Sequence, residues 1–309
     1  MKGVVLAAGL GTRLYPVTRE IAKPLLPIAN RMTLEYAFDQ LKECGITDVC
    51  VVVGEMEEQM RAELGDGSRF GVSLSFVRQT EPQGLAHAVG FAKEFVGDDD
   101  FLLYLGDAIY GQSLAPFVDQ YRQSGAANLN LVRHVDDPRR FGVANVEDGR
   151  IVKLVEKPEH PESNWAMAGM YIFGPQLWSV LPRLERGRGD EYQITDAIQM
   201  MIDEGELVVP GVFEGDWFDT GTRESFLFAS RSMAGDEPLV DSSAAVRADL
   251  QGHVVIGANA AVRATRIVNS VILPGATVEV EGEIVDSIVG GNVHAESLES
   301  AIRFGELDK

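Results

Sequence analysis

Cysteine is scarce in this chain, with only Cys44 and Cys50 among 309 residues. Two cysteines build neither a disulfide framework nor a metal site, so we interpret both as small buried hydrophobic side chains and expect a reducing, cytoplasmic location. The five histidines lack metal-ligand spacing, and the sequence has no nucleophile-elbow motif and no Ser-His-Asp order. It therefore offers no candidate for covalent catalysis.

Long apolar runs and an excess of basic charge are also missing. No run reaches the roughly 18 residues of a membrane helix, and the start of the chain has no signal-peptide pattern. Lysine and arginine number 27 against 47 acidic residues, a formal net charge of −20. Because so acidic a surface repels nucleic acid and anionic membranes, we expect neither as a partner.

The composition that remains is that of an ordinary globular protein. Hydrophobic residues make up 45% of the chain, and its length suits two domains. Apolar strands alternate with amphipathic helices up to about residue 232, for example helices expected at 32–44, 85–95 and 193–204. This alternation predicts a doubly wound, mostly parallel α/β sheet of Rossmann-like type.

The composition changes after a linker at 234–238. Aliphatic residues then recur every six positions, a spacing typical of a short left-handed parallel β-helix. A few irregular strands with chance spacing are the alternative. The repeat positions are Ile256, Val262, Val268 and then, in a shifted phase, Ile272, Val278 and Ile284.

The first strand, near Val4–Ala7, leads into a loop that contains Gly9, Gly11 and Arg13, and Lys23 follows ten residues later. Glycines let a backbone curl around a ligand, and free amides with fixed positive charge attract phosphate. An ordinary strand-to-helix turn with an exposed arginine is the alternative. Leu14 occupies the position of the third glycine of the dinucleotide fingerprint, so that fingerprint does not fit.

Two aspartates are candidates to hold a hard cation. Asp107 follows the apolar strand 101–105, and Asp219 follows the apolar Trp217-Phe218. Mg²⁺ is typically held by one or two carboxylates together with substrate phosphates, so this pair suffices. A plain Gly-Asp turn remains the alternative at Asp107.

Two further polar segments are candidates for substrate contacts. Glu156 and Lys157 close the strand 151–155, where the carboxylate can accept hydrogen bonds from sugar hydroxyls and the lysine can meet a phosphate. A solvated charged pair before Pro158 is the alternative. In the turn 79–88, Gln79 can read the amide edge of a base, and Gly84 can let the base approach the backbone.

The order of these motifs is more specific than any one of them. The chain closely resembles the sugar-1-phosphate nucleotidylyltransferases, and most of all the long-form glucose-1-phosphate thymidylyltransferases. The resemblance rests on Leu-Ala-Ala-Gly-Leu-Gly-Thr-Arg-Leu (6–14), Lys-Pro-Leu-Leu-Pro (23–27), Gly-Leu-Ala-His-Ala (84–88), Leu-Gly-Asp (105–107), Asp-Pro-x-x-Phe-Gly-Val-Ala (137–144), Val-Glu-Lys-Pro (155–158), Ile-Thr-Asp-Ala-Ile-Gln (194–199) and Trp-Phe-Asp-Thr-Gly (217–221).

The resemblance implies a role for each matching residue. Arg13, Lys23 and Lys157 would be catalytic, and Asp107 and Asp219 would bind Mg²⁺. Leu6, Ala8, Gly9, Gly11, Thr12, Arg13, Gln79, Gly84 and Asp107 would bind the nucleotide. Gly142, Glu156, Lys157, Asn164 and Tyr171 would bind the sugar phosphate.

The implied reaction is Mg²⁺-dependent transfer of a nucleotidyl group from dTTP to glucose 1-phosphate, which releases pyrophosphate. Residues 1–233 would form the catalytic domain, and residues 239–300 a β-helix that contacts other subunits of a homo-oligomer. Pro24 and Ala108 stand where thymidylyltransferases of this group commonly have glutamine and asparagine, so UTP, CTP or GTP with another sugar 1-phosphate is an alternative. A non-catalytic regulatory relative is a second alternative, against which the retained charged residues argue.

Overall fold

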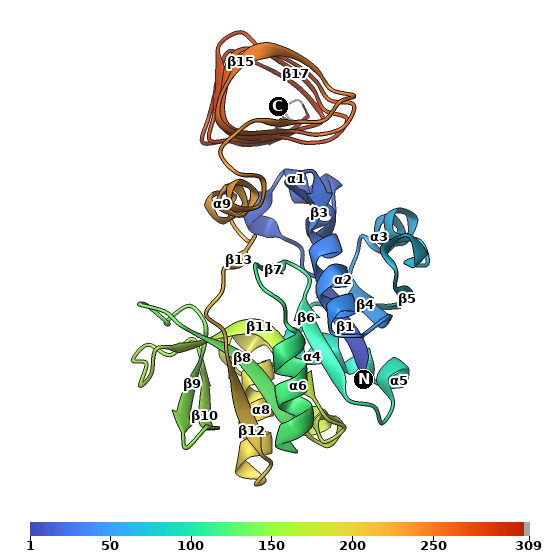
Figure 1. Ribbon diagram of the computed structural model, residues 1–309, viewed down its shortest axis with the longest axis vertical. Helices are drawn as coiled ribbons and strands as arrows, with labels where there is room; N and C mark the ends of the chain where they lie inside the picture. The colour runs from blue at the N-terminus through green and yellow to red at the C-terminus, as the bar shows by residue number, and fades with distance from the viewer. Residues whose placement is uncertain (306–309) are drawn as a thin grey trace. The chain divides into compact units, whose positions relative to one another are not determined.

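The computed structural model describes residues 1–305, which form two compact units (Figure 1). The first comprises Met1–Gly9 and Ala37–Trp217, and the second comprises Leu10–Tyr36 and the chain from Phe218 onward. The predicted phosphate-binding loop therefore begins in the first unit and continues in the second. No helix within the described chain is long and apolar enough to cross a membrane.

A nine-stranded mixed sheet forms the centre of the first unit. Its strands are β1 (Lys2–Ala7), β4 (Asp48–Val53), β5 (Ser73–Arg78), β6 (Phe101–Leu105), β8 (Asn128–His134), β9 (Gly142–Glu147), β10 (Arg150–Glu156), β11 (Trp165–Phe173) and β12 (Val208–Val212). The order β6-β1-β4-β5 is parallel, and β11 joins β6 antiparallel on the other side. β11 also pairs with β8 and β9, which in turn pair with β12 and β10. The predicted Rossmann-like α/β fold is confirmed.

Helices cover this sheet at the spacing that the sequence predicts, with one interruption. The helix expected at 85–95 is two shorter helices, because Phe91 and Ala92 donate their N–H groups to carbonyls three residues back instead of four. The helices are α2 (Thr33–Glu43), which leads from the second unit into the first, α3 (Glu57–Leu64), α4 (Leu85–Gly90), α5 (Lys93–Val96), α6 (Ala115–Ser124), α7 (Leu177–Val180) and α8 (Ile194–Asp203).

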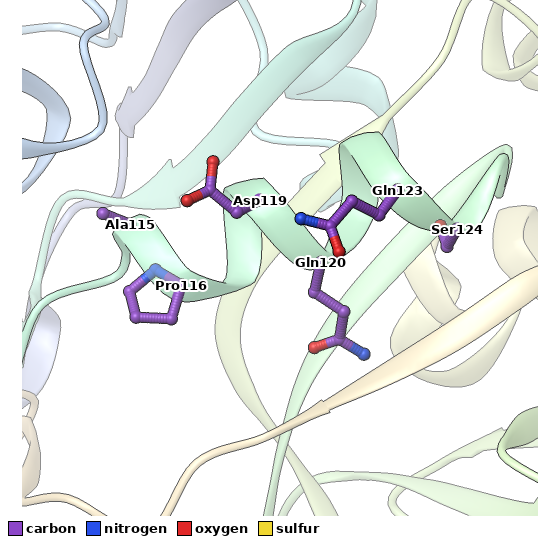
Figure 2. Close-up of a pocket in the computed structure, with 6 residues that line it drawn as sticks. All are labelled: Ala115, Pro116, Asp119, Gln120, Gln123 and Ser124. Atoms are coloured by element: carbon purple, nitrogen blue, oxygen red, sulfur yellow. The ribbon is translucent and has the colours of Figure 1, made fainter.

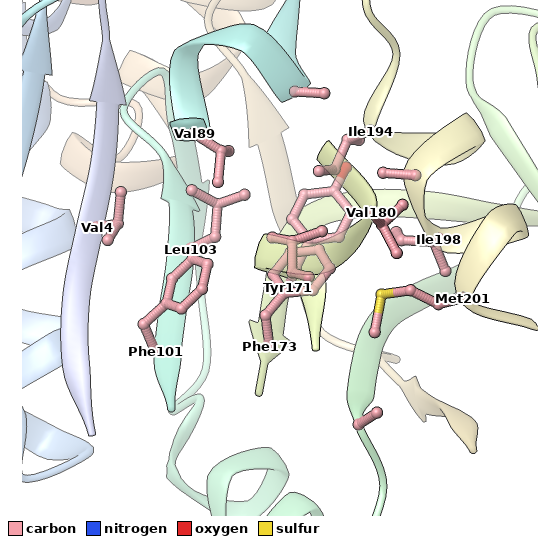
Figure 3. Close-up of a cluster of buried hydrophobic side chains, with 14 of the residues drawn as sticks. Val4, Val89, Phe101, Leu103, Tyr171, Phe173, Val180, Ile194, Ile198 and Met201 are labelled. Carbon is pink, nitrogen blue, oxygen red and sulfur yellow. The ribbon is translucent and has the colours of Figure 1, made fainter. Parts of the chain in front are cut away.

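A single hydrophobic cluster joins the sheet to the helices on one face (Figure 3). Val4 and Leu103 point from β1 and β6 toward Val89 of α4. Ile198 of α8 and Tyr171 of β11 belong to the same cluster. Because each of these side chains is almost wholly buried, the strand ends beside them are held in fixed positions.

The second unit begins with short elements that follow the glycine loop. They are η1 (Thr12–Leu14), α1 (Val17–Glu20), η2 (Lys23–Leu25), β2 (Pro27–Ile28) and β3 (Arg31–Met32). The chain returns to this unit at β13 (Trp217–Asp219) and continues into α9 (Arg223–Ala234). Thr222 and Ser225 form a capping box at the start of α9, which fixes where this helix begins.

A parallel β-helix completes the second unit. Its strands are β14 (Leu239–Val240), β15 (Ala245–Ile256), β16 (Ala261–Ile272), β17 (Thr277–Val280), β18 (Glu283–Val285), β19 (Ile288–Gly290), β20 (Asn292–Ala295), β21 (Leu298–Glu299) and β22 (Ile302–Phe304). Successive coils pair in parallel register, as in Val246↔Val262↔Val278↔Val293. Five of the six predicted repeat positions lie in its core, but Ile267 takes the place expected for Val268 because the register shifts within β16.

Candidate active site

The carboxyl ends of the parallel strands bring several predicted nucleotide-binding residues to one edge of the first unit. Leu6 pairs with Leu105 in the register of β1 and β6, and Gly106 donates its N–H to the Leu6 carbonyl at 2.9 Å. Gly9 and Asp107, which follow these strands, therefore share the edge. Ligands of open α/β sheets bind at such edges.

Gln79 reaches the same edge from β5. Its N–H bonds to the carbonyl of Val53, the last residue of β4, at 2.9 Å. Gly54, which no sequence motif marks, follows β4 directly. A Cβ at Gly54 would lie 2.7 Å from the Ala8 carbonyl oxygen, so a side chain there would push Ala8, at the start of the glycine loop, away from β4.

The Gln79 side chain is buried and held by a histidine. Its Nε2 lies 3.1 Å from Nδ1 of His87 on α4. The His87 ring packs edge-on against Phe91 and is stacked on Tyr192 at 6.2 Å between centroids. His87 thus orients the amide that the sequence assigns to the base.

Gly84 is required by the protein's own backbone. Its φ is +108°, and a Cβ there would lie 2.6 Å from the carbonyl oxygen of Tyr192. Tyr192 also donates its N–H to Gln83 and accepts the N–H of Ala86. The glycine therefore lets the segment before α8 pack against the start of α4.

The predicted sugar-phosphate residues gather where β9, β10 and α8 meet. Glu156 pairs with Lys157 Nζ at 2.7 Å through one carboxylate oxygen, and it accepts the Thr195 hydroxyl at 3.2 Å through the other. A Cβ at Gly142 would lie 2.7 Å from Thr195 Cγ2 and 3.3 Å from Glu156 Oε2. Thr195 lies in one of the motifs that carry the resemblance, but the sequence assigned no function to it. Its contact with Glu156 joins residues 39 positions apart and is not visible in the sequence.

The backbone of Lys157 is fixed independently of its side chain. Its φ is +43°, a region that a non-glycine residue seldom adopts. Its N–H bonds to the Phe141 carbonyl at 3.0 Å, and its own carbonyl accepts a hydrogen bond from Arg188. The exposed Lys157 ammonium therefore extends from a turn whose backbone is held by two hydrogen bonds.

Tyr171 and Asn164 lie near this cluster in different ways. Tyr171 is buried on β11; burial raises the pKa of its hydroxyl above the ordinary value, and the charge of Glu156 raises it further. It therefore keeps its proton. Asn164 is exposed just before β11, and its carbonyl accepts the N–H of Val135 at 3.0 Å.

In the second unit, the glycine loop and the predicted lysine lie together. Gly11 has a φ of +62°, and its carbonyl accepts the Thr18 hydroxyl at 2.8 Å. A Cβ at Gly11 would lie 3.2 Å from the Cβ of Lys23. The loop is thus packed against the stem of Lys23, and Thr12 beside it is exposed.

Arg13 lines an open cavity of about 480 Å³ within the second unit. Arg223, at the start of α9, lines the same cavity, together with Tyr15, Thr222, Glu224, Ser300 and Ile302. Glu224 binds one terminal nitrogen of Arg223 at 2.5 Å, and the buried Nε has no hydrogen-bond partner within residues 1–305. Arg223 follows the recognised Trp-Phe-Asp-Thr-Gly motif by two residues, and no sequence signal marked it.

The two predicted metal ligands belong to different units. Asp107 is half-buried, Asp219 is exposed, and a Cβ at Gly221 would lie 2.8 Å from Oδ1 of Asp219. Glycine at 221 therefore lets this carboxylate lie close against the backbone. Within the described chain, no three or more His, Cys, Asp or Glu side chains form a metal-binding group.

Another hollow, on the surface of α6, contains none of the predicted residues. Its walls are Ala115, Pro116, Asp119, Gln120, Gln123 and Ser124, all from one helix (Figure 2). Figure 2 shows their side chains spread along the helix without convergence on one point. We therefore assign no function to this hollow.

Comparison with known proteins identifies relatives across nearly the whole chain. The family model described as nucleotidyl transferase matches residues 2–235. A low-salt glycan biosynthesis nucleotidyltransferase of Haloferax volcanii is 35% identical over 94% of this chain and 92% of its own length. A glucose-1-phosphate thymidylyltransferase of Streptomyces griseus is 39% identical over 94% of this chain and 81% of its own length.

Solved structures point to the same group. A Bacillus anthracis protein described as a glucose-1-phosphate thymidylyltransferase, crystallised with a sucrose, has a TM-score of 0.71 and 34% identity, with 77% of this chain and 96% of that chain covered. A UDP-glucose pyrophosphorylase in complex with UDP-glucose has a TM-score of 0.69 and 26% identity, with 76% and 99% covered.

Proposed function

The chain belongs to the sugar-1-phosphate nucleotidyltransferase family, and from that membership we propose that it transfers the thymidylyl group of dTTP to glucose 1-phosphate. The products are dTDP-glucose and pyrophosphate. Sugar-phosphate nucleotidyl transfer is the activity of the family. What we propose is the choice of dTTP and glucose 1-phosphate as the substrates.

The observation that carries the proposal is the cluster of Glu156, Lys157 and Thr195. A carboxylate held from two sides can accept hydrogen bonds from sugar hydroxyls, and the lysine beside it can meet the sugar's phosphate. Both groups are fixed before substrate arrives, which lowers the entropic cost of positioning the nucleophile.

The reaction needs no base from the protein. A phosphate oxygen of the sugar 1-phosphate, already ionised near neutral pH, attacks the α-phosphorus of the triphosphate. A new P–O bond forms as the bond to pyrophosphate breaks, and negative charge moves onto the leaving group. We assign Lys157 to the attacking phosphate, and Arg13 and Lys23 to the pyrophosphate, where their charges offset the one that develops.

Asp107 and Asp219 are the residues that would hold Mg²⁺. Two carboxylates suffice, because Mg²⁺ usually takes its other ligands from water and substrate phosphates. The described chain has no larger acidic group for a fully protein-bound cation, and Gly221 lets the Asp219 carboxylate lie close against the backbone. When bound, Mg²⁺ would neutralise phosphate charge.

The nucleotide base is assigned to Gln79 and Gly84. His87 orients the side-chain amide of Gln79, so the polar edge of a base would meet an amide held in a fixed position. Pro24 offers no side-chain donor, and thymine selection would therefore depend on Gln79 and backbone groups. UTP is the second candidate, because Pro24 and Ala108 depart from the thymidylyl pattern and one structural relative is a UDP-glucose pyrophosphorylase.

The test combines a substrate panel with one variant. The purified protein is incubated with Mg²⁺, each common nucleoside triphosphate and several sugar 1-phosphates, and nucleotide sugars are identified by mass. We expect dTDP-glucose as the main product; preference for another pair would replace the proposed substrates, and no product from any pair would refute enzymatic activity.

Arg13→Ala should lower turnover by about 10²-fold or more, since it removes a charge from the leaving group. Arg31→Ala, which removes another exposed arginine of the same unit, serves as the control and should retain turnover. Near-normal turnover in Arg13→Ala would contradict the role of Arg13, provided that circular dichroism shows both variants folded.

A further inference from the structure

A cavity of about 380 Å³ lies within the first unit, among α4, α5, α7 and the segment before α8. Its volume falls in the range of small-molecule sites, roughly 300–1,000 Å³. The rings of His87, Trp178 and Tyr192 line it, and Leu181 and Leu184 add aliphatic wall. The proposed reaction leaves this cavity without a role.

The aromatic walls of the cavity are held in place by residues that do not line it. The Trp178 indole donates its N–H to the Gly97 carbonyl at 3.0 Å and is stacked on Phe101, with 5.2 Å between the ring centroids. The guanidinium of Arg186 lies 5.5 Å from the centroid of the Tyr192 ring. Because these walls are already ordered, a ligand loses little of its binding free energy to arranging them.

Two hydrogen-bond donors at the cavity have no partner within residues 1–305. One is the exposed Lys93 ammonium. The other is Nε2 of His87: Nδ1 accepts the side-chain N–H of Gln79 at 3.1 Å, so Nε2 carries the proton of the neutral ring. The amide nitrogen of Gln83 is already bonded to Glu81. No carboxylate of the described chain lines the cavity.

An aromatic molecule with one acidic group matches this combination. Its ring would lie among the three side-chain rings, where offset and edge-on contacts are favourable. Its acidic group would meet the Lys93 ammonium, and one of its oxygens would accept the N–H at Nε2 of His87. Because a single ammonium offsets a single negative charge, the cavity suits a monocarboxylate better than a triphosphate.

We propose that this cavity binds a small aromatic carboxylate, and that the bound ligand strengthens nucleotide binding through His87. An acceptor at Nε2 binds only the tautomer whose proton is at Nε2, so the ligand favours that tautomer over the other. Nδ1 then remains the acceptor for Gln79, and the Gln79 amide stays in one orientation with its oxygen available to a base. The coupling rests on the proposed assignment of Gln79 to the base, whereas ligand binding in the cavity does not.

Binding is tested by isothermal titration calorimetry of the full-length protein at pH 8 and low salt, with 2-naphthoate as the probe. We expect saturable binding at one site, and at least about tenfold weaker binding of 2-naphthamide, which has the same rings without the charge. Lys93→Gln should weaken naphthoate binding at least about tenfold, because it removes the charged donor. Lys93→Arg should keep the Kd within about threefold of wild type. Lys153→Gln, at an exposed position outside the cavity, controls for net charge and should leave the Kd unchanged.

Gly90 allows the cavity to be filled without a clash in the backbone. It lines the cavity and is exposed, and a Cβ there would meet no atom within 4 Å. Gly90→Leu should therefore fold normally and weaken naphthoate binding at least about tenfold, because its side chain occupies the space of the ligand. Gly90→Ala adds only a methyl group and should bind within about threefold of wild type. The melting temperature of each variant verifies folding.

The coupling is measured by titration of dTTP with and without saturating 2-naphthoate. The probe should lower the Kd of dTTP about fivefold, and dTTP should lower the Kd of the probe by the same factor. His87→Phe keeps a ring in the cavity but has no nitrogen, so it should still bind the probe and lose the coupling.

These titrations need no turnover, so they separate the cavity from the proposed reaction. Probe binding by a protein that makes no nucleotide sugar would refute the proposed function and leave the cavity assignment standing. Absence of naphthoate binding, equal binding of the amide, or wild-type affinity in both Lys93→Gln and Gly90→Leu would overturn the cavity assignment. An unchanged or raised Kd of dTTP in the presence of the probe would overturn the coupling, and so would absence of dTTP binding.

Discussion

Glu156 owes its position to two neighbours of different kinds. Lys157 supplies a positive charge beside one carboxylate oxygen, and Thr195 supplies a neutral donor from α8 to the other. The lysine is itself assigned to substrate phosphate, so its hold on Glu156 can relax when substrate binds. The threonine hydroxyl then becomes the fixed partner that keeps the carboxylate aimed at the sugar.

Thr195→Val should therefore raise the KM for the sugar 1-phosphate by about tenfold, since one hydrogen bond to a charged group is worth about 1.5–3 kcal/mol and only part of it is lost. Turnover should change little. Thr195→Ser keeps the hydroxyl and should retain a near-normal KM, which steady-state kinetics can verify. Equal KM values for the two variants would contradict a positioning role for the hydroxyl.

The sequence predicted Glu156 and Lys157 as a functional pair because they are adjacent and end a strand. It gave no role to Thr195, Arg188 or Arg223, whose contacts are made between segments distant in sequence or inside a cavity. Charge and chain order are visible in a sequence, but packing partners are not. Gly54 illustrates the same limit, since its closeness to Ala8 arises only from strand register.

At the scale of elements, strand and helix types were predictable and interruptions were not. Apolar runs indicated β1 and β6, but hydrophobic period alone did not show that the helix at 85–95 is broken after Gly90. In the β-helix the six-residue period predicted five of six core positions correctly, but a register shift within β16 brings Ile267 inward in place of Val268. A period cannot reveal where a coil gains or loses a residue.

α9 is joined to the β-helix by a buried histidine. His253 of β15 lies with Nδ1 3.1 Å from the Gly235 carbonyl and Nε2 3.1 Å from the Ser230 hydroxyl. Burial is the main cause that lowers the pKa of His253 below its ordinary value of 6.5. The folded protein therefore binds this proton less readily than the unfolded chain.

The free energy of unfolding should consequently fall as pH drops below about 6.5, and this contribution should be fully present above that value. Urea unfolding at a series of pH values from 7.5 to about 5 measures the slope. His253→Gln should flatten it, whereas His160→Gln, at an exposed position, should leave it as in wild type. An unchanged slope in His253→Gln would show that other groups cause the pH dependence.

At the scale of the whole molecule, the excess of acidic residues is the dominant property. The net charge of −20 is distributed over a folded chain of 33.6 kDa, so like charges lie closer together than in the unfolded state. Many acidic residues on this surface have arginine or lysine partners, but exposed pairs of this kind contribute little to stability. Self-repulsion therefore opposes folding at low ionic strength.

Added salt should raise the melting temperature. The Debye length falls from about 10 Å at 0.1 M to about 3 Å at 1 M, which screens repulsion between exposed carboxylates. A gain of about 1 kcal/mol would shift the melting temperature of a protein of 309 residues by roughly 1.5 °C, from an unfolding entropy of about 2.1 cal/mol/K per residue. Calorimetry in increasing NaCl should show most of the rise below about 0.5 M, where screening changes most steeply.

Sucrose at matched osmolality controls for preferential exclusion, which acts without screening. A melting temperature that stays constant or falls over this range would show that the acidic surface does not limit stability.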